Sequence, residues 1–192
     1  MKAFVINLDH RADRMMSFNK NNFPFKVERI SGLQLSHPGI ANTQTQLNIF
    51  KEQKKFPFII FEDDCIMLEP WSVVEMAMSQ LPSNWDALWL GATLTHYLTR
   101  YSQNLFRLKR AYTTHAIIYN SKKMIDYIID HYNKTPIQNV NDVFYYKEIE
   151  EKFNCFITYP ICATQYGSVS DVMGTFQPQT VIVDSYNKYT SR

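Results

Sequence analysis

Three consecutive acidic residues, Glu62, Asp63 and Asp64, follow an unbroken apolar run at positions 58–61. A short apolar run that begins after a proline is typical of a strand buried on both faces, so the three carboxylates should lie where such a strand ends. Two like charges about 4 Å apart repel by roughly 4 kcal/mol at an effective dielectric of 20. A divalent cation would relieve this repulsion, because magnesium and manganese prefer clustered oxygen ligands.

Side chains alternate along an extended chain, so Glu62 and Asp64 share one face and Asp63 points away. The functional interpretation is an acidic edge that binds a metal and leaves one acid to contact a ligand hydroxyl. An ordinary acidic turn after a strand explains the same residues, and the spacing leaves both interpretations open.

Positive charge follows the first predicted strand, which covers residues 3–8 and ends with Asn7 and Leu8. Asp9 is the predicted cap of a helix over residues 10–20 that carries Arg11 and Arg14. In open α/β sheets ligands bind at the carboxyl ends of the strands. Arg11 or Arg14 could therefore contact a diphosphate, while a solvated helix face is the structural alternative.

Two later acids and one histidine are further candidates. Asp142 opens a predicted helix, where the helix dipole favours an anion, and it would be a catalytic base if that helix pointed into the cleft. Asp171 lies in a loop rich in small residues. His115 belongs to a β-rich segment, 111–119, and a core position is favoured over a ligand contact.

The composition is that of an ordinary globular protein, with 192 residues, 45% hydrophobic, 20% charged and a net charge of +2. We expect one domain over 1–185 and a polar, frayed tail over 186–192. The small net charge gives no indication of nucleic-acid binding. No stretch approaches the ~18–20 apolar residues of a membrane span, and the short apolar N-terminus does not predict a signal peptide. Three cysteines without metal spacing favour reduced core thiols in a cytoplasmic protein.

Strand-like and helix-like segments alternate, which predicts an α/β sandwich with a mixed sheet. Neither GxGxxG nor GxxxxGK[ST] occurs, so a bound nucleotide would need another scheme. The remaining predicted strands cover 25–30, 58–61, 86–90, 105–109, 111–119, 153–159 and 181–183. The remaining predicted helices cover 42–55, a segment from the Ser72–Glu75 capping box to Pro82, one capped by Ser121, and one from 139.

The chain resembles glycosyltransferase family 25, the lipopolysaccharide-type and collagen-type galactosyltransferases. VINLDHRADR resembles the family's opening strand, FIIFEDDCIM its Glu-Asp-Asp motif, and WDALWLGA the strand that follows. AYTTHAIIYNSKKM, NDVFY and ITYPICATQYGSVSD resemble its later blocks, in the same order along the chain.

This resemblance implies a glycosyltransferase A-type fold, a Rossmann-like α/β/α sandwich with a mixed central sheet. It also implies a manganese or magnesium ion, a UDP-sugar donor of the galactose or glucose class, and a glycan or glycoconjugate acceptor. By position, Asp64 would bind the metal, and Glu62 and Asp63 would support it or hold the ribose. Asn7, Leu8, Arg11 and Arg14 would border the nucleotide. Asp142 would be the base of an inverting transfer, with Asp171 as second choice.

The family carries a histidine in the segment ahead of the acidic motif, whereas the corresponding segment here, GIANTQTQLNIF, has none. The chain is also short for this family. These departures favour one alternative, a degenerate transferase fold that only binds a glycan or a partner protein. A metal-dependent phosphotransferase or nuclease is a second alternative, against which the near-neutral charge argues. A lipid-linked acceptor would bring at most a peripheral membrane contact.

Overall fold

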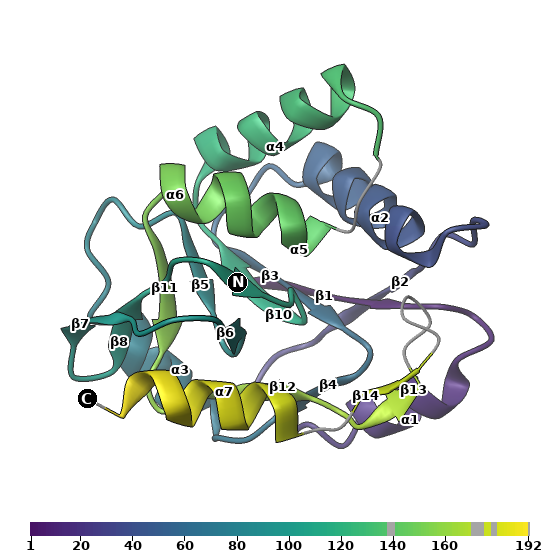
Figure 1. Ribbon diagram of the computed structural model, residues 1–192. Coiled ribbons are helices and arrows are strands. Elements are labelled where there is room, and N and C mark those ends of the chain that lie inside the picture. The colour runs from purple at the N-terminus through teal and green to yellow at the C-terminus, as the bar shows by residue number, and fades with distance from the viewer. Residues whose placement is uncertain (138–140, 170–174, 178–179, 192) are drawn as a thin grey trace.

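The protein is built on one large mixed sheet (Figure 1), described in a computed structural model for residues 1–137, 141–169, 175–177 and 180–191. The eight strands of this sheet follow the order β2-β1-β3-β10-β5-β11-β8-β7. On one side β1 (Lys2–Asn7) pairs in parallel with both β2 (Glu28–Ser31) and β3 (Phe58–Glu62). Because these three strands are parallel, their carboxyl ends lie at the same edge.

The other half of the sheet mixes directions. Strand β10 (Ala116–Tyr119) runs antiparallel between β3 and β5 (Ala87–Trp89), and β11 (Cys155–Thr158) is parallel to β5. The edge is formed by β8 (Leu105–Arg107) and β7 (Thr99–Ser102), both in antiparallel pairings. Three two-stranded ladders lie outside the sheet: β4 (Cys65–Met67) with β12 (Ala163–Gln165), β6 (Thr93–Leu94) with β9 (Ala111–Tyr112), and β13 (Ser168–Val169) with β14 (Phe176–Gln177).

Helices cover both faces of the sheet (Figure 1). One face carries α2 (Pro38–Glu52), α4 (Lys122–Lys134) and a helical segment formed by α5 (Asn141–Phe144), the π-helix η1 (Tyr145–Ile149) and α6 (Glu150–Lys152). The other carries α1 (Ala12–Phe18) and α3 (Trp71–Met78). The last helix, α7 (Thr180–Thr190), packs against β6 and β12.

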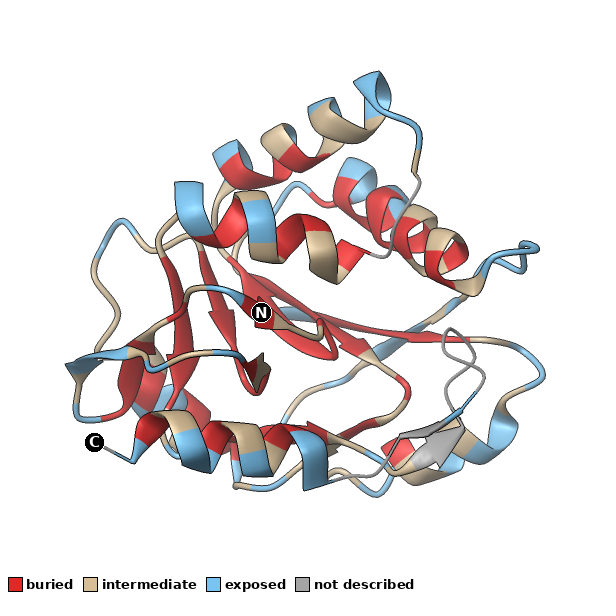
Figure 2. Cartoon of the chain, in the orientation of Figure 1, coloured by how far each residue is buried: buried red, intermediate tan, exposed pale blue. Residues whose placement is uncertain are grey.

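The alternation of side chains along the strands separates two hydrophobic clusters. Figure 2 shows that the strands between the helices are largely buried. Phe58 and Ile60 of β3 pack under α2 and α4, whereas Ile59 and Phe61 face α1 and α3. All four side chains are at most 1% exposed. The predicted strand buried on both faces is therefore confirmed, and the acids do follow its end.

Several local predictions are wrong at the helix starts. Asp9 does not cap α1, which begins after Arg11 without a side-chain cap. The carboxylate of Asp9 instead accepts hydrogen bonds from Arg29 and Ser31. Helix α3 begins at Trp71, one residue before the Ser72–Glu75 box, so its start lies where expected and only the cap by Ser72 is not observed. Helix α2 begins at Pro38, four residues before the predicted start. The Ser121 cap is confirmed, because its Oγ accepts from the Met124 N–H at 3.2 Å.

The C-terminal segment differs most from expectation. Residues 181–183 belong to α7 instead of a strand, and the predicted frayed tail is helical as far as Thr190. Tyr186 is 2% exposed, and its hydroxyl donates to the Thr158 carbonyl at 2.6 Å. A buried aromatic ring with a satisfied hydroxyl thus anchors a segment whose composition is polar. None of the helices described is long and apolar enough to cross a membrane.

Candidate functional site

A cavity of about 610 Å³ opens at the carboxyl ends of β1, β2 and β3. This volume is in the range of sites for small molecules and cofactors. All three acids of the 62–64 motif line it, and Arg14 and Asp142 line it too. Its other walls come from Ile6, Leu8, His10, residues 32–35, Pro38, Gly39, Ala41, Asn42, Thr45, Thr113, Thr114, Asn141 and Gln165.

Glu62, the last residue of β3, is held by two neutral donors. Asn42 Nδ2 donates to its Oε1 at 3.1 Å, and Thr114 Oγ1 donates to the same oxygen at 2.9 Å. Burial raises the pKa of Glu62 to about 7, and the nearby charge of Asp64 adds to this rise. The carboxylate thus lies in a poorly solvated position without a cation of its own among the described ion pairs.

Asp63 points to the opposite side, as the alternation predicts. Asn7 Nδ2 donates to its Oδ2 at 2.7 Å, and Arg14 Nη1 donates to Oδ1 at 3.2 Å. Arg29 Nε in turn donates to Asn7 Oδ1 at 2.8 Å, which fixes the orientation of the amide. Asp63 is 6% exposed, and burial raises its pKa although Asn7 and Arg14 act against the rise. This network makes Asp63 an anchor between β1 and β3.

Asp64 faces the cavity with a partner on each side. Gln165 Nε2 lies 3.4 and 3.3 Å from its two carboxylate oxygens, and Arg14 Nη1 lies 3.8 Å from Oδ2. The Tyr166 N–H also donates to the Asp64 carbonyl at 2.6 Å, which fixes the backbone. Burial raises the pKa of Asp64 to about 6, against the effect of the Arg14 guanidinium.

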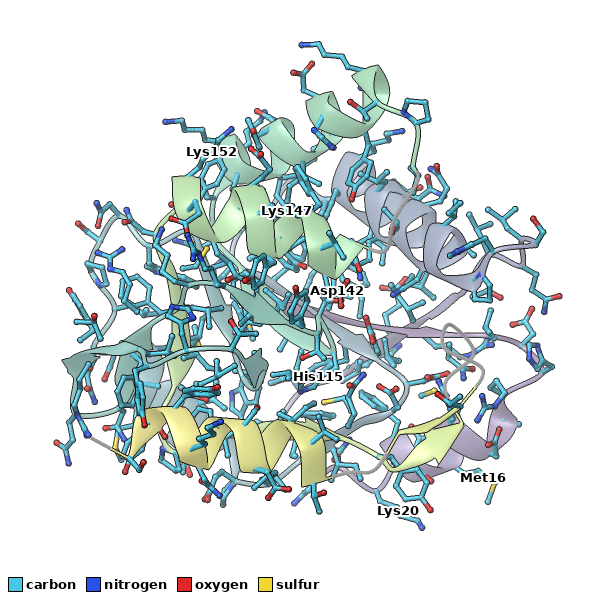
Figure 3. The ribbon with its side chains drawn as sticks, viewed as in Figure 1. Met16, Lys20, His115, Asp142, Lys147 and Lys152 are labelled. Atoms are coloured by element: carbon cyan, nitrogen blue, oxygen red, sulfur yellow. The ribbon has the colours of Figure 1, made fainter. Side chains whose placement is uncertain are left out.

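Asp142 and its neighbours form another part of the cavity lining. Asp142 lies at the start of α5, near the centre of the molecule (Figure 3). Burial raises its pKa, while the backbone N–H groups of Val143 and Thr113 act in the other direction. Its Oδ1 has no hydrogen-bond partner in the part of the chain that the structure describes. Thr113 has a φ of 77°, an uncommon conformation for a β-branched residue.

The structure brings most of the predicted site residues close together, but only some of them line the cavity. Leu8 and Arg14 line the cavity, whereas Asn7 is 2% exposed and lies behind Asp63. Arg11 donates to the exposed Asp13 at 3.1 Å and is not among the lining residues. Asp171 falls outside the described residues. The assigned roles of all these side chains remain predictions.

Several lining residues were not singled out by sequence reasoning. Asn42 is the first residue of the helix predicted over 42–55, but it lies one turn inside α2, and its Nδ2 donates to Glu62. Gln165 and Thr114 occur within the family-like blocks, so their position in the ordered motifs was the available signal. The segment 32–35 gave no signal, because a loop without periodicity does not reveal which strand ends it crosses.

His115 and Gly91 lie behind the site rather than in it. His115 is fully buried, and burial lowers its pKa to about 4, with the Ala163 backbone acting in the other direction. A Cβ on Gly91 would lie 1.9 Å from the Ala163 carbonyl oxygen. Glycine is therefore required at this position by a close approach between two backbones.

The aromatic residues do not line this cavity. Trp89 is 1% exposed in the core, and Tyr97 stacks edge-on against Tyr189. Tyr166 is exposed and lines a second cavity of about 410 Å³ between α1 and the β4–β12 ladder. Apolar contacts in the main cavity come instead from aliphatic side chains such as Leu8, Leu33 and Leu35.

Glu62 and Asp64 fit a metal that is shared with a ligand better than one held by protein alone. No group of three or more His, Cys, Asp or Glu side chains suited to a metal occurs among the described residues. Magnesium is commonly bound by one or two carboxylates together with substrate phosphates. Burial is the main cause of the raised pKa values of Glu62 and Asp64, and the neighbouring carboxylates add to it; a bound cation would favour the ionised forms of both.

Comparisons with known proteins support the fold at a coarse level. No family model and no curated protein matches the sequence. Among solved structures, A197 from STIV is similar with a TM-score of 0.55 and 12% identity, over 93% of this chain and 94% of that chain. HddC from Yersinia pseudotuberculosis has a TM-score of 0.44 and 13% identity, over 97% of this chain and 76% of that chain. The similarity to A197 from STIV extends over nearly the whole length of both chains and shows a shared mixed α/β fold.

Proposed function

We propose that this protein is a metal-dependent glycosyltransferase that moves a hexose from a UDP-sugar to a hydroxyl of a glycan or glycoconjugate. One observation carries the proposal: the three acids of the 62–64 motif, Arg14 and Asp142 line a single cavity at the ends of parallel strands. The mixed α/β fold is compatible with this chemistry, and the ordered resemblance of the sequence to family 25 supports it.

The donor diphosphate would lie against the acidic edge. A manganese or magnesium ion bound by Asp64 and Glu62 would act as a Lewis acid on the leaving diphosphate. Arg14 already lies 3.2 Å from Asp63 and 3.8 Å from Asp64, so its guanidinium can share the added negative charge. The aliphatic wall of Leu8, Leu33 and Leu35 would contact the nucleoside.

Asp142 would act as the base. In an inverting transfer the acceptor oxygen forms a bond to the anomeric carbon while the bond from that carbon to the diphosphate oxygen breaks. The acceptor's proton passes to the carboxylate, and UDP leaves with the bonding electrons. Burial raises the pKa of Asp142 above its ordinary value, which is the direction of change that favours a general base.

The decisive experiment measures melting temperature with UDP, UDP-glucose and UDP-galactose, each with and without Mn²⁺. A ligand at 100 times its dissociation constant adds about 2.7 kcal/mol to the free energy of unfolding, which for a chain of this size raises the melting temperature by roughly 5–10 °C. We expect a metal-dependent shift with UDP and at least one UDP-sugar. Release of UDP on incubation with a hydroxyl acceptor would then establish transfer.

Asp64→Asn is the test variant and Glu75→Gln, at an exposed position of α3, is its matched control. Asp64→Asn should abolish the metal-dependent shift, and Glu75→Gln should retain it. A shift that needs metal but leads to no transfer would favour the alternative of a glycan- or partner-binding protein. The absence of any shift with every nucleotide would overturn the proposed function.

A further inference from the structure

The Asn141 side chain is buried in the cavity wall with half of its amide unsatisfied. It is 4% exposed and lines the cavity. Its Oδ1 lies 3.5 Å from Thr114 Oγ1, whereas Nδ2 has no hydrogen-bond partner among the described residues. Buried amide groups are almost always paired, so one that is unpaired at a cavity indicates a missing ligand group.

The hydroxyl of Thr114 determines which orientation of the Asn141 amide is favoured. A threonine hydroxyl has one proton, and Thr114 gives it to Glu62 Oε1 at the shorter distance of 2.9 Å. The Thr114 hydroxyl can then only accept a hydrogen bond from Asn141. This favours an Asn141 amide whose nitrogen faces Thr114 and whose oxygen faces away from it. In either orientation one polar atom of Asn141 remains to be satisfied, and a hydroxyl can satisfy it because it both donates and accepts.

Thr113 and Asp142, which line the cavity beside Asn141, also carry a buried polar atom without a partner among the described residues. These atoms are Thr113 Oγ1 and Asp142 Oδ1. We call Thr113, Asn141 and Asp142 the α5 wall. Unpaired donors and acceptors of mixed type suit a ligand that presents several hydroxyls, whereas a phosphate would meet the Asp142 carboxylate with like charge.

We propose that Thr113 and Asn141 of the α5 wall bind hydroxyl groups of the donor hexose, with Asp142 left to the acceptor hydroxyl, and that Asn141 is a specificity-determining residue for this sugar. This inference rests on the proposed function, because it assumes that the cavity takes a UDP-hexose. Thr114 joins this wall to the acidic edge, because its hydroxyl lies 2.9 Å from Glu62 Oε1 and 3.5 Å from Asn141 Oδ1, so the hexose would bind next to the diphosphate.

Asn42 provides a matched comparison in the same cavity. It is also an asparagine, but its Nδ2 is already engaged with Glu62 at 3.1 Å. Asn42→Ala should therefore disturb the acidic edge and weaken UDP and UDP-hexose alike. Asn141→Ala should act on the hexose alone, because it removes no contact to the acids that bind the diphosphate.

The test is to measure dissociation constants for UDP and for UDP-hexose, in the presence of Mn²⁺, by calorimetry on wild type, Asn141→Ala and Asn42→Ala. We expect Asn141→Ala to weaken UDP-hexose about tenfold, which corresponds to about 1.4 kcal/mol, and to leave UDP within twofold. Equal weakening of both ligands, or none, by Asn141→Ala would overturn the inference while leaving the proposed function standing. If wild type binds neither ligand, the proposed function itself fails.

A second measurement tests the inference even if Asn141→Ala does not fold. Wild type should bind at least one monodeoxy analogue of the UDP-hexose about tenfold more weakly than the parent, and Asn141→Ser, which is smaller but still polar, should lose that discrimination. Equal affinity of wild type for every monodeoxy analogue would overturn the inference without any variant.

Discussion

Two groups of buried carboxylates lie in this molecule, and their surroundings differ. The acids at 62–64 share Arg14, Asn7, Asn42 and Gln165 as partners and open onto the cavity. Glu150, at the start of α6, is fully buried, accepts one hydrogen bond from the Ala111 N–H at 2.8 Å, and lines neither of the two cavities described.

Burial raises the pKa in both places, to about 7 for Glu62, about 6 for Asp64 and about 8 for Glu150. A raised pKa therefore does not identify a functional site here. The distinguishing features are an accessible cavity, a cation beside the acids and several oriented donors. Variants at the two places should accordingly separate effects on activity from effects on stability.

The largest expected effect is on transfer in Asp64→Asn. The substitution keeps the shape of the side chain and removes the charge that would bind the metal, so we expect at least about a 100-fold loss of kcat/KM, which corresponds to about 2.7 kcal/mol in the transition state. Steady-state release of UDP measures the loss. A melting temperature close to that of wild type is the control for folding, and full activity in this variant would remove the acidic edge from the mechanism.

Arg14→Gln should reduce both activity and stability. The side chain is 11% exposed and pairs with Asp63, which is 8% exposed, so its removal leaves a buried carboxylate without its cation. Breaking a buried pair from one side costs about 3 kcal/mol. Denaturant unfolding measures this cost, and Lys122→Gln, whose partner Asp126 is exposed, is the matched control with little expected change. Equal stability of the two variants would contradict the described difference in burial.

Glu150→Gln should alter stability without altering transfer. The pKa of Glu150 is about 8 in the folded protein, mainly because of burial, with Lys109 acting against it and Glu151 and Asp142 adding to it. In the unfolded chain the value is near 4.5. The folded state therefore keeps a proton that the unfolded state releases, and stability falls by up to about 1.4 kcal/mol per pH unit between these values.

The variant cannot ionise, so this part of the pH dependence should disappear. Chemical unfolding at intervals from pH 4.5 to 8 should give a flatter stability curve for Glu150→Gln than for wild type, with the two closest at the acidic end. Parallel curves would show that Glu150 ionises normally, and a loss of transfer would show that the two groups of acids are not separate.

Gln165→Ala should have the smallest effect. Its Nε2 lies 3.3 and 3.4 Å from the Asp64 oxygens, which are long distances for a hydrogen bond. We expect a rise of about two- to threefold in KM for the donor, which corresponds to roughly 0.5 kcal/mol, and no change in melting temperature. A loss as large as that of Asp64→Asn would instead make Gln165 essential for holding that carboxylate.

The strands could be predicted better than the caps and the tail. The apolar run at 58–61 and the helix after Ser121 have strong local patterns, and both lie where expected. The prediction of a frayed tail was wrong because no local pattern indicates that Tyr186 will be buried and bonded to Thr158, 28 residues earlier in the chain. Asp9 failed as a cap because Arg29 and Ser31 on the neighbouring strand compete for its carboxylate.

The sequence by itself determined that three carboxylates follow a buried strand and that Glu62 and Asp63 point to opposite sides, because both follow from local hydrophobicity and the two-residue period of extended chains. Only the tertiary structure decided which side chains surround them. Parallel pairing of β1, β2 and β3 brings Arg14 and the loop after β2 to the same edge, and the antiparallel insertion of β10 brings Thr114 to Glu62. These contacts join residues up to about a hundred positions apart, as between Asp64 and Gln165, and no local pattern encodes such pairings.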